Sequence, residues 1–206
     1  MDTEFEVKFY PVDKLALQRK LVSLGAKLVS PERKMRRVIY DQVIHPEFKC
    51  GFLRIRDEGS KITMSTKSHS KTGKIEDEKE IEIVISNYDK AVEILKLVNL
   101  EPDKYQETLR ESWELDSCHI DIDTWPGLDT YCEIESDSEI KIKSLSEKLG
   151  FDWTQHLISN SMDMLIDTYQ LSVKKTLALA SNLTFENNPF ANLPKKGRVK
   201  SKSIGL

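Results

Sequence analysis

Charged and apolar residues alternate along several short stretches of this chain. The first is EFEVKF at residues 4–9, where every second residue is charged: Glu4, Glu6 and Lys8. A period of two is typical of a β-strand that has one polar and one apolar face. Taken alone, such a stretch is most simply a surface strand whose charges face water. The alternative is that charged faces of several strands face one another.

The same alternation recurs through the first 136 residues. Charged or polar residues occupy every second position around the apolar ones in these segments: Arg54 and Arg56; Thr63, Ser65 and Lys67; Glu78, Glu80 and Glu82; Asp121 and Asp123; Glu133 and Glu135; with Arg110 in the middle of a further segment. The pattern predicts eight strands, at residues 3–10, 35–45, 51–58, 61–68, 78–85, 104–115, 118–125 and 130–136.

Four segments instead repeat with the period of a helix. Asp13 and Asn87 are suitable N-terminal caps for two of them, and Gly25 and Gly150 are suitable C-terminal stops. The apolar stripes predict helices at about residues 13–25, 87–98, 139–149 and 159–171.

These elements predict an α+β fold, a closed eight-stranded antiparallel β-barrel with helices packed on its outside. If the charged faces point outward, the barrel interior is apolar, and the helices have no apolar surface to cover. If the apolar faces lie outside under the helices, the charged faces line a central tunnel. Buried charges then require partners of opposite sign, or a ligand and a metal. Periodicity alone leaves both arrangements open.

Charge is distributed unevenly along the 206 residues. The chain has 31 Lys and Arg against 34 Asp and Glu, a net charge of −3, but the residues from Leu171 onward carry +6 and those before it −9. An acidic body argues against nonspecific binding to nucleic acid, which needs a broad basic face. We expect one domain over residues 1–172 and a basic, flexible extension over residues 173–206.

The cysteines and the hydropathy indicate the compartment. Cys50, Cys118 and Cys132 are isolated, which indicates reduced thiols in a cytoplasmic protein and argues against a disulfide scaffold or a zinc site. No apolar stretch approaches the length of a membrane span, and no apolar signal segment follows the acidic N-terminus. We therefore expect a cytoplasmic protein with no membrane association.

The charged motifs occur in a recognisable order. E-x-E-x-K at residues 4–8, LRIR at residues 53–56, a later basic residue, DID at residues 121–123 and EIE at residues 133–135 together resemble the CYTH superfamily over about residues 3–170. These triphosphate tunnel metalloenzymes include class IV adenylate cyclases, thiamine triphosphatases and inorganic triphosphatases. The resemblance implies a β-tunnel that binds a triphosphate with Mg²⁺ or Mn²⁺.

The resemblance also implies roles for individual residues. The metal ligands are Glu4, Glu6, Glu133 and Glu135, whose hard oxygen atoms suit Mg²⁺. The substrate-binding residues are Lys8, Arg54, Arg56, Lys67 and Arg110, because arginine and lysine bind phosphate oxygens. The catalytic set is Lys8 with Glu80 or Glu82 and Asp121 or Asp123, and the choice within each acidic pair stays open.

The chain departs from the family pattern at three places. The segment VIYDQVIHPEFKCGF before LRIR follows the family only loosely, and Thr108 stands where the family often has a basic residue. The residues beyond about 172 have no counterpart in the family.

The resemblance allows three functions for a small triphosphate ligand. The first is a metal-dependent triphosphatase, in which water attacks the terminal phosphorus. The second is a class IV adenylate cyclase, which would need an adenine pocket that no motif declares. The third is a non-catalytic triphosphate- or polyphosphate-binding module, against which the complete acidic set argues. Hydrolysis requires the fewest special features, and we expect a monomer or a homodimer.

Overall fold

The structure is a computed structural model that describes residues 5–41, 50–68 and 80–197. The described chain forms two compact units. Unit 1 comprises residues 5–33, 108–178 and 188–197, and unit 2 comprises residues 34–41, 50–68, 80–107 and 179–187.

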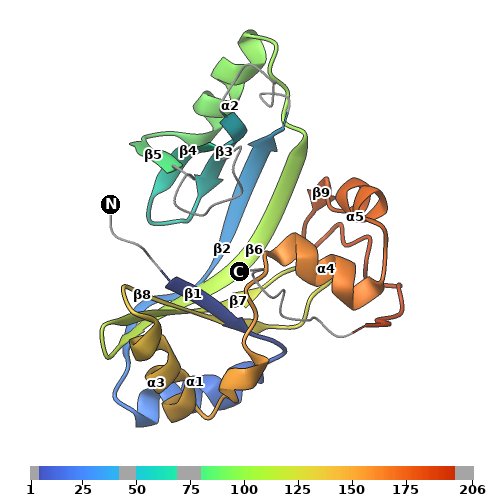
Figure 1. Cartoon of the computed structure of the whole chain (residues 1–206). Helices are drawn as coiled ribbons and strands as arrows, with labels where there is room; N and C mark the ends of the chain where they lie inside the picture. The colour runs from blue at the N-terminus through green and yellow to red at the C-terminus, as the bar shows by residue number, and fades with distance from the viewer. Residues whose placement is uncertain (1–4, 42–49, 69–79, 198–206) are drawn as a thin grey trace. The chain divides into compact units, whose positions relative to one another are not determined.

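The elements follow one another along the chain as strands interrupted by helices (Figure 1). Their order and bounds are β1 (Phe5–Phe9), α1 (Lys14–Ser23), β2 (Lys27–Tyr40), β3 (Cys50–Asp57), β4 (Ile62–Ser68), β5 (Glu80–Ile85), α2 (Tyr88–Leu97), β6 (Lys104–Leu115), β7 (Cys118–Thr124), β8 (Tyr131–Ser136), α3 (Glu139–Leu149), a 3₁₀ turn (Trp153–Gln155), α4 (Ser161–Tyr169), α5 (Val173–Leu179) and β9 (Asn182–Leu183).

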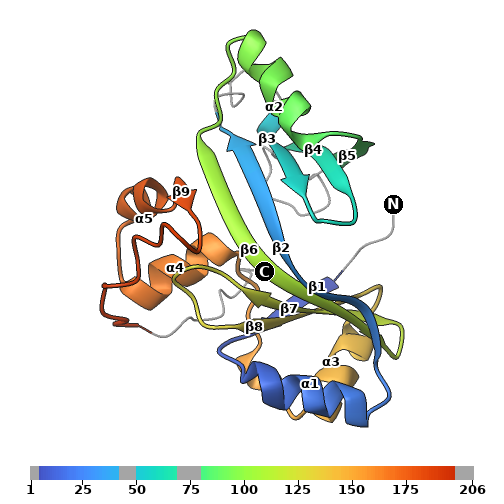
Figure 2. The same cartoon turned by 180° about the vertical axis from the view of Figure 1, so that it is seen from behind.

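Helices α1 and α3 cover one face of strands β1, β7 and β8 in unit 1, as seen from both sides in Figures 1 and 2. The helix stripes and the apolar strand faces form one buried cluster, which includes Val7, Leu17, Leu21, Ile120, Ile122, Ile134, Ile142 and Leu145. The apolar strand faces therefore lie beneath helices, as the tunnel arrangement requires of this unit.

Local chemistry starts and stops these helices where the sequence predicts. The side chain of Asp13 accepts a hydrogen bond from the backbone N–H of Ala16 at 3.0 Å, and that of Asn87 caps α2 in the same way. Gly150 ends α3 with a φ of 92°, a left-handed conformation that glycine adopts at little cost.

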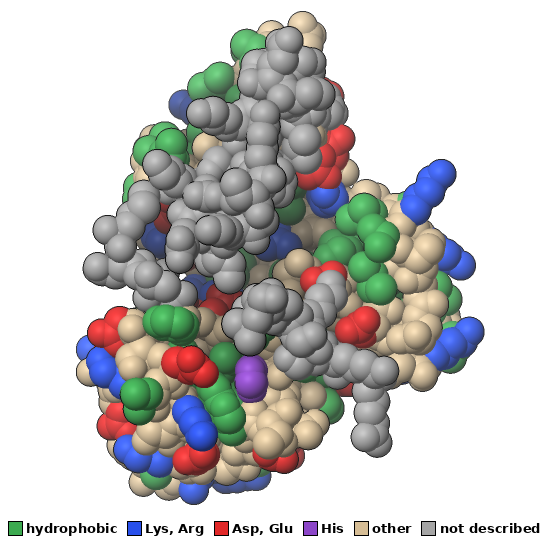
Figure 3. Space-filling view, in the orientation of Figure 1, with side chains coloured by type: hydrophobic (Ala, Val, Ile, Leu, Met, Phe, Trp, Pro, Cys, Tyr) green, Lys and Arg blue, Asp and Glu red, His purple; other side chains and the backbone are tan. Residues whose placement is uncertain are grey.

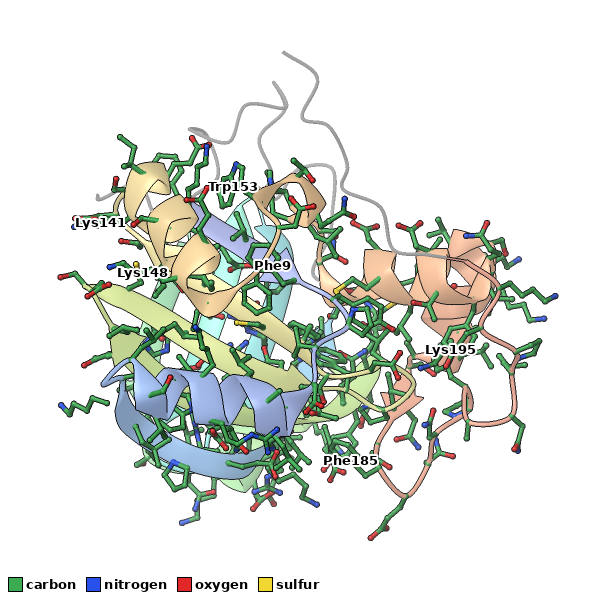
Figure 4. All side chains as sticks on the ribbon, turned by 90° about the horizontal axis from the view of Figure 1, so that it is seen from below. Phe9, Lys141, Lys148, Trp153, Phe185 and Lys195 are labelled. Atoms are coloured by element: carbon green, nitrogen blue, oxygen red, sulfur yellow. The ribbon has the colours of Figure 1, made fainter. Side chains whose placement is uncertain are left out.

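Phe9 lies on the face of β1 that packs against the helices of unit 1. Its ring stacks on that of Phe151 at a centroid distance of 4.3 Å. Figure 4 shows Phe9 pointing beneath α3, whereas Lys141 and Lys148 lie on the outer side of that helix. In Figure 3, acidic and basic side chains are interspersed over the surface around α3, as expected for its solvated face.

Unit 2 repeats this arrangement with a single helix. Helix α2 packs on β3, and the buried Val38, Tyr40, Ile55 and Tyr88 form its core. The charged faces of β3 and β4 are on the opposite side of the strands from this helix, because neighbouring residues of a strand alternate between its faces.

The predicted closed barrel is wrong. The strands form one nine-stranded sheet in the order β1-β8-β7-β6-β2-β3-β4-β5, and β9 pairs with β6. Among the described residues, β1 and β5 are the two edges of this sheet, and no ladder joins them. The α+β class and the antiparallel pairing of the eight predicted strands hold, but closure does not.

The largest change in an element concerns β2, which begins at Lys27 instead of residue 35. Charged residues and Pro31 interrupt the alternation in its first half, so the sequence pattern hides that half. In the described part of the chain, no helix has both the length and the apolar character needed to cross a membrane.

The segment predicted to be a flexible extension is packed over residues 173–197. It contains α5 and β9, and the side chains of Thr176, Leu183 and Phe190 are completely buried. The aromatic ring of Phe190 contacts that of Tyr169 at a centroid distance of 5.0 Å within unit 1. The domain boundary at residue 172 stays a prediction.

Candidate functional site

The strand register gathers charged residues on one face of unit 1. Lys8 of β1 lies opposite Glu133 of β8, which in turn lies opposite Asp121 of β7. Glu6 lies opposite Glu135 in the neighbouring row. Directly opposed residues of antiparallel strands share a face, so these side chains lie on the side of the sheet away from α1 and α3.

Arg110 of β6 is the centre of this charged face. Its Nε and Nη2 atoms bind the two carboxylate oxygens of Asp123 at 2.7 and 2.5 Å. Its Nη1 atom lies 2.5 Å from Asp121 Oδ2, and Nη2 lies 3.3 Å from Glu133 Oε1. One guanidinium thus binds three carboxylates, with a bidentate pair to the one that is completely buried.

Lys8 connects the first strand to the same cluster. Its ammonium contacts the carboxylate of Glu6 and lies 3.1 Å from Glu133 Oε2, and only 7% of the residue is exposed. Burial alone would lower the pKa of Lys8, but the negative charges of Glu133 and Glu6 outweigh it and raise that pKa. Lys8 is therefore protonated at neutral pH, although its side chain is almost completely buried.

The pKa values of the two aspartates of β7 are shifted in opposite directions. Complete burial raises the pKa of Asp123 to about 6. The negative charges of Glu133 and Asp121 also raise this pKa, whereas the positive charge of Arg110 lowers it. Burial also acts to raise the pKa of Asp121, but a hydrogen bond from His119 and the charge of Arg110 lower it below its usual value. Asp123 is thus the carboxyl group that titrates closer to neutral pH.

The acidic set fits a hard divalent cation. Glu6 and Glu135 are directly opposed, and like charges in that position repel by about 0.2–1 kcal/mol, which a cation between them would remove. Among the described residues, no three acidic, His or Cys side chains form a ready-made metal cage. Mg²⁺ typically uses one or two carboxylates together with substrate phosphates and waters, and the opposed pair offers two. Mn²⁺ prefers the same oxygen donors.

Unit 2 carries the second predicted group of residues. Arg54 and Arg56 of β3 lie opposite Ser65 and Thr63 of β4 on the face away from α2. Arg56 Nη2 lies 2.5 Å from Glu58 Oε1 and 3.8 Å from Glu82 Oε2. In backbone register, Lys67 lies opposite Glu80, and Ser65 lies opposite Glu82.

The structure therefore brings the predicted residues together in two groups. Seven of them share the charged face of unit 1: Glu6, Lys8, Arg110, Asp121, Asp123, Glu133 and Glu135. Five belong to the strands of unit 2: Arg54, Arg56, Lys67, Glu80 and Glu82. Glu4 lies outside the described residues. The individual roles of these residues stay predictions.

Sequence reasoning missed several charged residues next to these groups. His119 Nε2 lies 3.2 Å from Asp121 Oδ1, and Arg33 Nη1 lies 3.3 Å from Ser112 Oγ in unit 1. Arg37 lies opposite Arg56 in unit 2. The period-two signal extends to His119, which precedes the DID motif by two residues. On β2 the alternation is interrupted, by neighbouring charged residues around Arg33 and by the adjacent Arg36 and Arg37, so no signal marked these two arginines.

Solved structures of other proteins share this fold. A conserved hypothetical protein from Pyrococcus furiosus is 20% identical, with 77% of this chain and 98% of that chain covered and a TM-score of 0.59. The PH1012 protein of Pyrococcus horikoshii OT3 has the same identity and TM-score, covering 77% and 96% of the two chains. A Vibrio parahaemolyticus protein described provisionally as an adenylate cyclase is 14% identical, with 86% and 98% covered and a TM-score of 0.63.

These identities are low, so the likeness to solved structures concerns the fold alone. No curated protein matches the chain significantly. The family model of the CYTH domain matches residues 2–163. Since this range includes most of the chain and all the charged motifs, the chain belongs to the CYTH family.

Proposed function

We propose that the chain is a metal-dependent phosphohydrolase that acts on a triphosphate, either inorganic tripolyphosphate or a nucleoside or thiamine triphosphate. The observation that carries this proposal is the charged face of unit 1. There, Lys8 and Arg110 hold the three carboxylates of Asp121, Asp123 and Glu133 on the side of the sheet opposite the helices, beside the opposed pair of Glu6 and Glu135. A surface that only stabilised the fold would not need two directly opposed carboxylates.

The residues present suit each part of the reaction. Glu6 and Glu135, with Glu133, would hold Mg²⁺ or Mn²⁺. The bound metal ion would neutralise part of the negative charge of the phosphate groups. Lys8 and Arg110 stabilise the negative charge that builds up on phosphate oxygens. In unit 2, Arg54, Arg56 and Lys67 are proposed to bind phosphate oxygens.

The chemical step transfers the terminal phosphoryl group to water. The water oxygen forms a bond to the terminal phosphorus, and the bond from that phosphorus to the bridging oxygen breaks with its electron pair leaving on the bridge. An acidic residue of the predicted catalytic set accepts the proton of the water. Orthophosphate and the shortened diphosphate leave.

The direct test is incubation of the purified protein with tripolyphosphate, ATP and thiamine triphosphate in the presence of Mg²⁺ or Mn²⁺. Orthophosphate release that stops on addition of a chelator is the expected result. Pyrophosphate together with cyclic AMP from ATP would identify an adenylate cyclase instead. Tight binding of a triphosphate with no turnover would identify a binding module, and neither binding nor turnover would refute the proposal.

A further inference from the structure

Arg37 extends the row of basic residues in unit 2. Its Cα lies opposite that of Arg56 in the ladder between β2 and β3, so both side chains leave the same face of the sheet. Arg36 and Val38, its neighbours on β2, face the other way: Val38 lies in the core under α2, and Arg36 stacks on the ring of Tyr88 at 4.2 Å. Arg37 thus belongs to the face of the predicted phosphate-binding residues.

The opposition of two arginines is itself informative. Like charges directly opposed on neighbouring strands are unfavourable by about 0.2–1 kcal/mol. Arg56 shares its guanidinium with the carboxylates of Glu58 and Glu82. A pair of opposed guanidinium groups is also the arrangement that a doubly charged phosphate group binds well, because each planar group takes two oxygens.

Gln106 of β6 holds Arg37 in place. Its Oε1 atom accepts hydrogen bonds from Arg37 Nη2 at 2.8 Å and Arg37 Nε at 3.0 Å. Only 1% of Gln106 is exposed. The acceptor is a neutral amide, so this contact fixes one edge of the guanidinium without adding a negative charge.

The C-terminal segment fixes Gln106 in turn. Gln106 Nε2 donates a hydrogen bond to the carbonyl oxygen of Ala180 at 2.9 Å. The backbone N–H of Tyr105 donates to the carbonyl of Ser181 at 2.7 Å, where β9 pairs with β6. These bonds determine which end of the Gln106 amide faces Arg37, because the N–H₂ group must point to Ala180.

We propose that Arg37 is a further substrate-binding residue for phosphate oxygens, and that Gln106 is its positioning residue, anchored by residues 180–183. This inference rests on the proposed function and extends it in two ways. It adds a basic residue that the family resemblance did not supply, in a chain where Thr108 replaces an expected one. It also gives the segment after residue 172 a role in the site.

The test compares steady-state kinetics with tripolyphosphate and Mg²⁺ for four variants. Arg37→Gln is expected to raise KM at least 10-fold and to change kcat less than about 3-fold. Arg37→Lys is expected to fall between that variant and the native protein, because lysine keeps the charge but loses the fork. Gln106→Met, which keeps the length of the side chain, is expected to raise KM several-fold. The double variant that combines Gln106→Met with Arg37→Gln should have a KM no higher than that of Arg37→Gln alone.

Arg36→Gln is the matched control, because it changes the adjacent arginine on the opposite face. Its KM should equal that of the native protein. Circular dichroism and melting temperature identify any variant that does not fold, and calorimetric binding of tripolyphosphate to Arg37→Lys then serves as the second measurement. An unchanged KM in Arg37→Gln, or additive effects in the double variant, would overturn the inference. If the native protein still hydrolyses tripolyphosphate, the proposed function would be unaffected by that result. A native protein that neither binds nor hydrolyses triphosphates would overturn both.

Discussion

At the scale of single residues, the two faces of unit 1 differ in how they are stabilised. The apolar face gains from burial beneath α1 and α3, whereas the charged face depends on two cations that each bind several carboxylates. Glu6 and Glu135 are like charges in direct opposition on neighbouring strands, so this pair is where stability and function should conflict, although Lys8 also contacts Glu6.

Replacing Glu135 should separate these two effects. Glu135→Gln is expected to lower metal-dependent turnover at least 100-fold, because it removes a charged oxygen ligand from the opposed pair. The melting temperature should be unchanged or slightly higher, since the like-charge repulsion of about 0.2–1 kcal/mol is removed. Phosphate-release assays and thermal unfolding measure the two quantities. Glu139→Gln in the first turn of α3 is the matched control, and turnover equal to the control would show that Glu135 is no metal ligand.

Removing Arg110 should cost stability in a pH-dependent way. Arg110→Leu leaves the buried Asp121, Asp123 and Glu133 without their common partner, so the free energy of unfolding at pH 7.5 is expected to fall by about 3–5 kcal/mol. The pKa of Asp123 is already raised to about 6 in the native protein. The charge of Arg110 lowers the pKa of both Asp121 and Asp123, so its loss raises these folded-state pKa values in the variant. A folded-state pKa above the unfolded value means that stability increases as the pH falls, so the variant should gain more stability than the native protein between pH 7.5 and 5.5.

Urea unfolding at pH 7.5 and 5.5 measures this prediction. The deficit of Arg110→Leu relative to the native protein should be smaller at the lower pH. Lys148→Leu, which removes a half-exposed cation paired with Asp116 at 2.6 Å, should cost less than about 1 kcal/mol. A deficit in Arg110→Leu as small as that of the control would mean that the three carboxylates do not need the guanidinium.

At the scale of secondary structure, the short final strand matters more than its length suggests. Strand β9 has two residues, yet Leu183 is completely buried and lies opposite Gln106 in the parallel ladder with β6. The burial of Leu183 and the two hydrogen bonds from β6 to the carbonyl groups of Ala180 and Ser181 hold this segment in a defined position, although its sequence has little periodicity.

Truncating this side chain should therefore be costly. Leu183→Ala is expected to lower the free energy of unfolding by about 2–5 kcal/mol, as for other fully buried leucines. Leu177→Ala in α5, where the side chain is 37% exposed, is the control and should cost clearly less. Thermal and urea unfolding measure both. Shortening the chain after Asn182 would remove Leu183 and Phe190 together and should lower the melting temperature further; full stability in that protein would contradict this packing.

At the scale of the whole molecule, ligand and metal should stabilise the fold together. The carboxylates of unit 1 repel a polyphosphate unless a cation lies between them. Tripolyphosphate with Mg²⁺, at about 100 times the dissociation constant, is expected to add about 2.7 kcal/mol to the free energy of unfolding. Each component alone should add much less. Thermal shift with sulfate plus Mg²⁺ is the control, and an equal shift with sulfate would indicate nonspecific anion binding.

Much of the local structure could be predicted from the sequence. The period of two in EFEVKF, HIDID and YCEIE determined that charged and apolar side chains leave opposite faces of the strands, and the periods of the helices with Asp13, Asn87 and Gly150 determined their limits. These patterns are local, so each depends only on backbone geometry and nearby side chains. The ordered motifs were sufficient to indicate the CYTH family.

Other features depend on contacts between distant residues. Whether β1 and β5 pair decides between a closed barrel and an open sheet, and no alternation within either strand encodes that choice. The role of Arg37 depends on its register with Arg56 and on a hydrogen bond to Gln106, 69 positions along the chain. Likewise, Leu183 reads as part of a polar tail until β6 is placed beside it.

The sequence by itself determined which residues share a face of each element, because that follows from backbone periodicity. Only the tertiary structure decided which faces meet, because register and closure are set by packing between segments far apart in the chain.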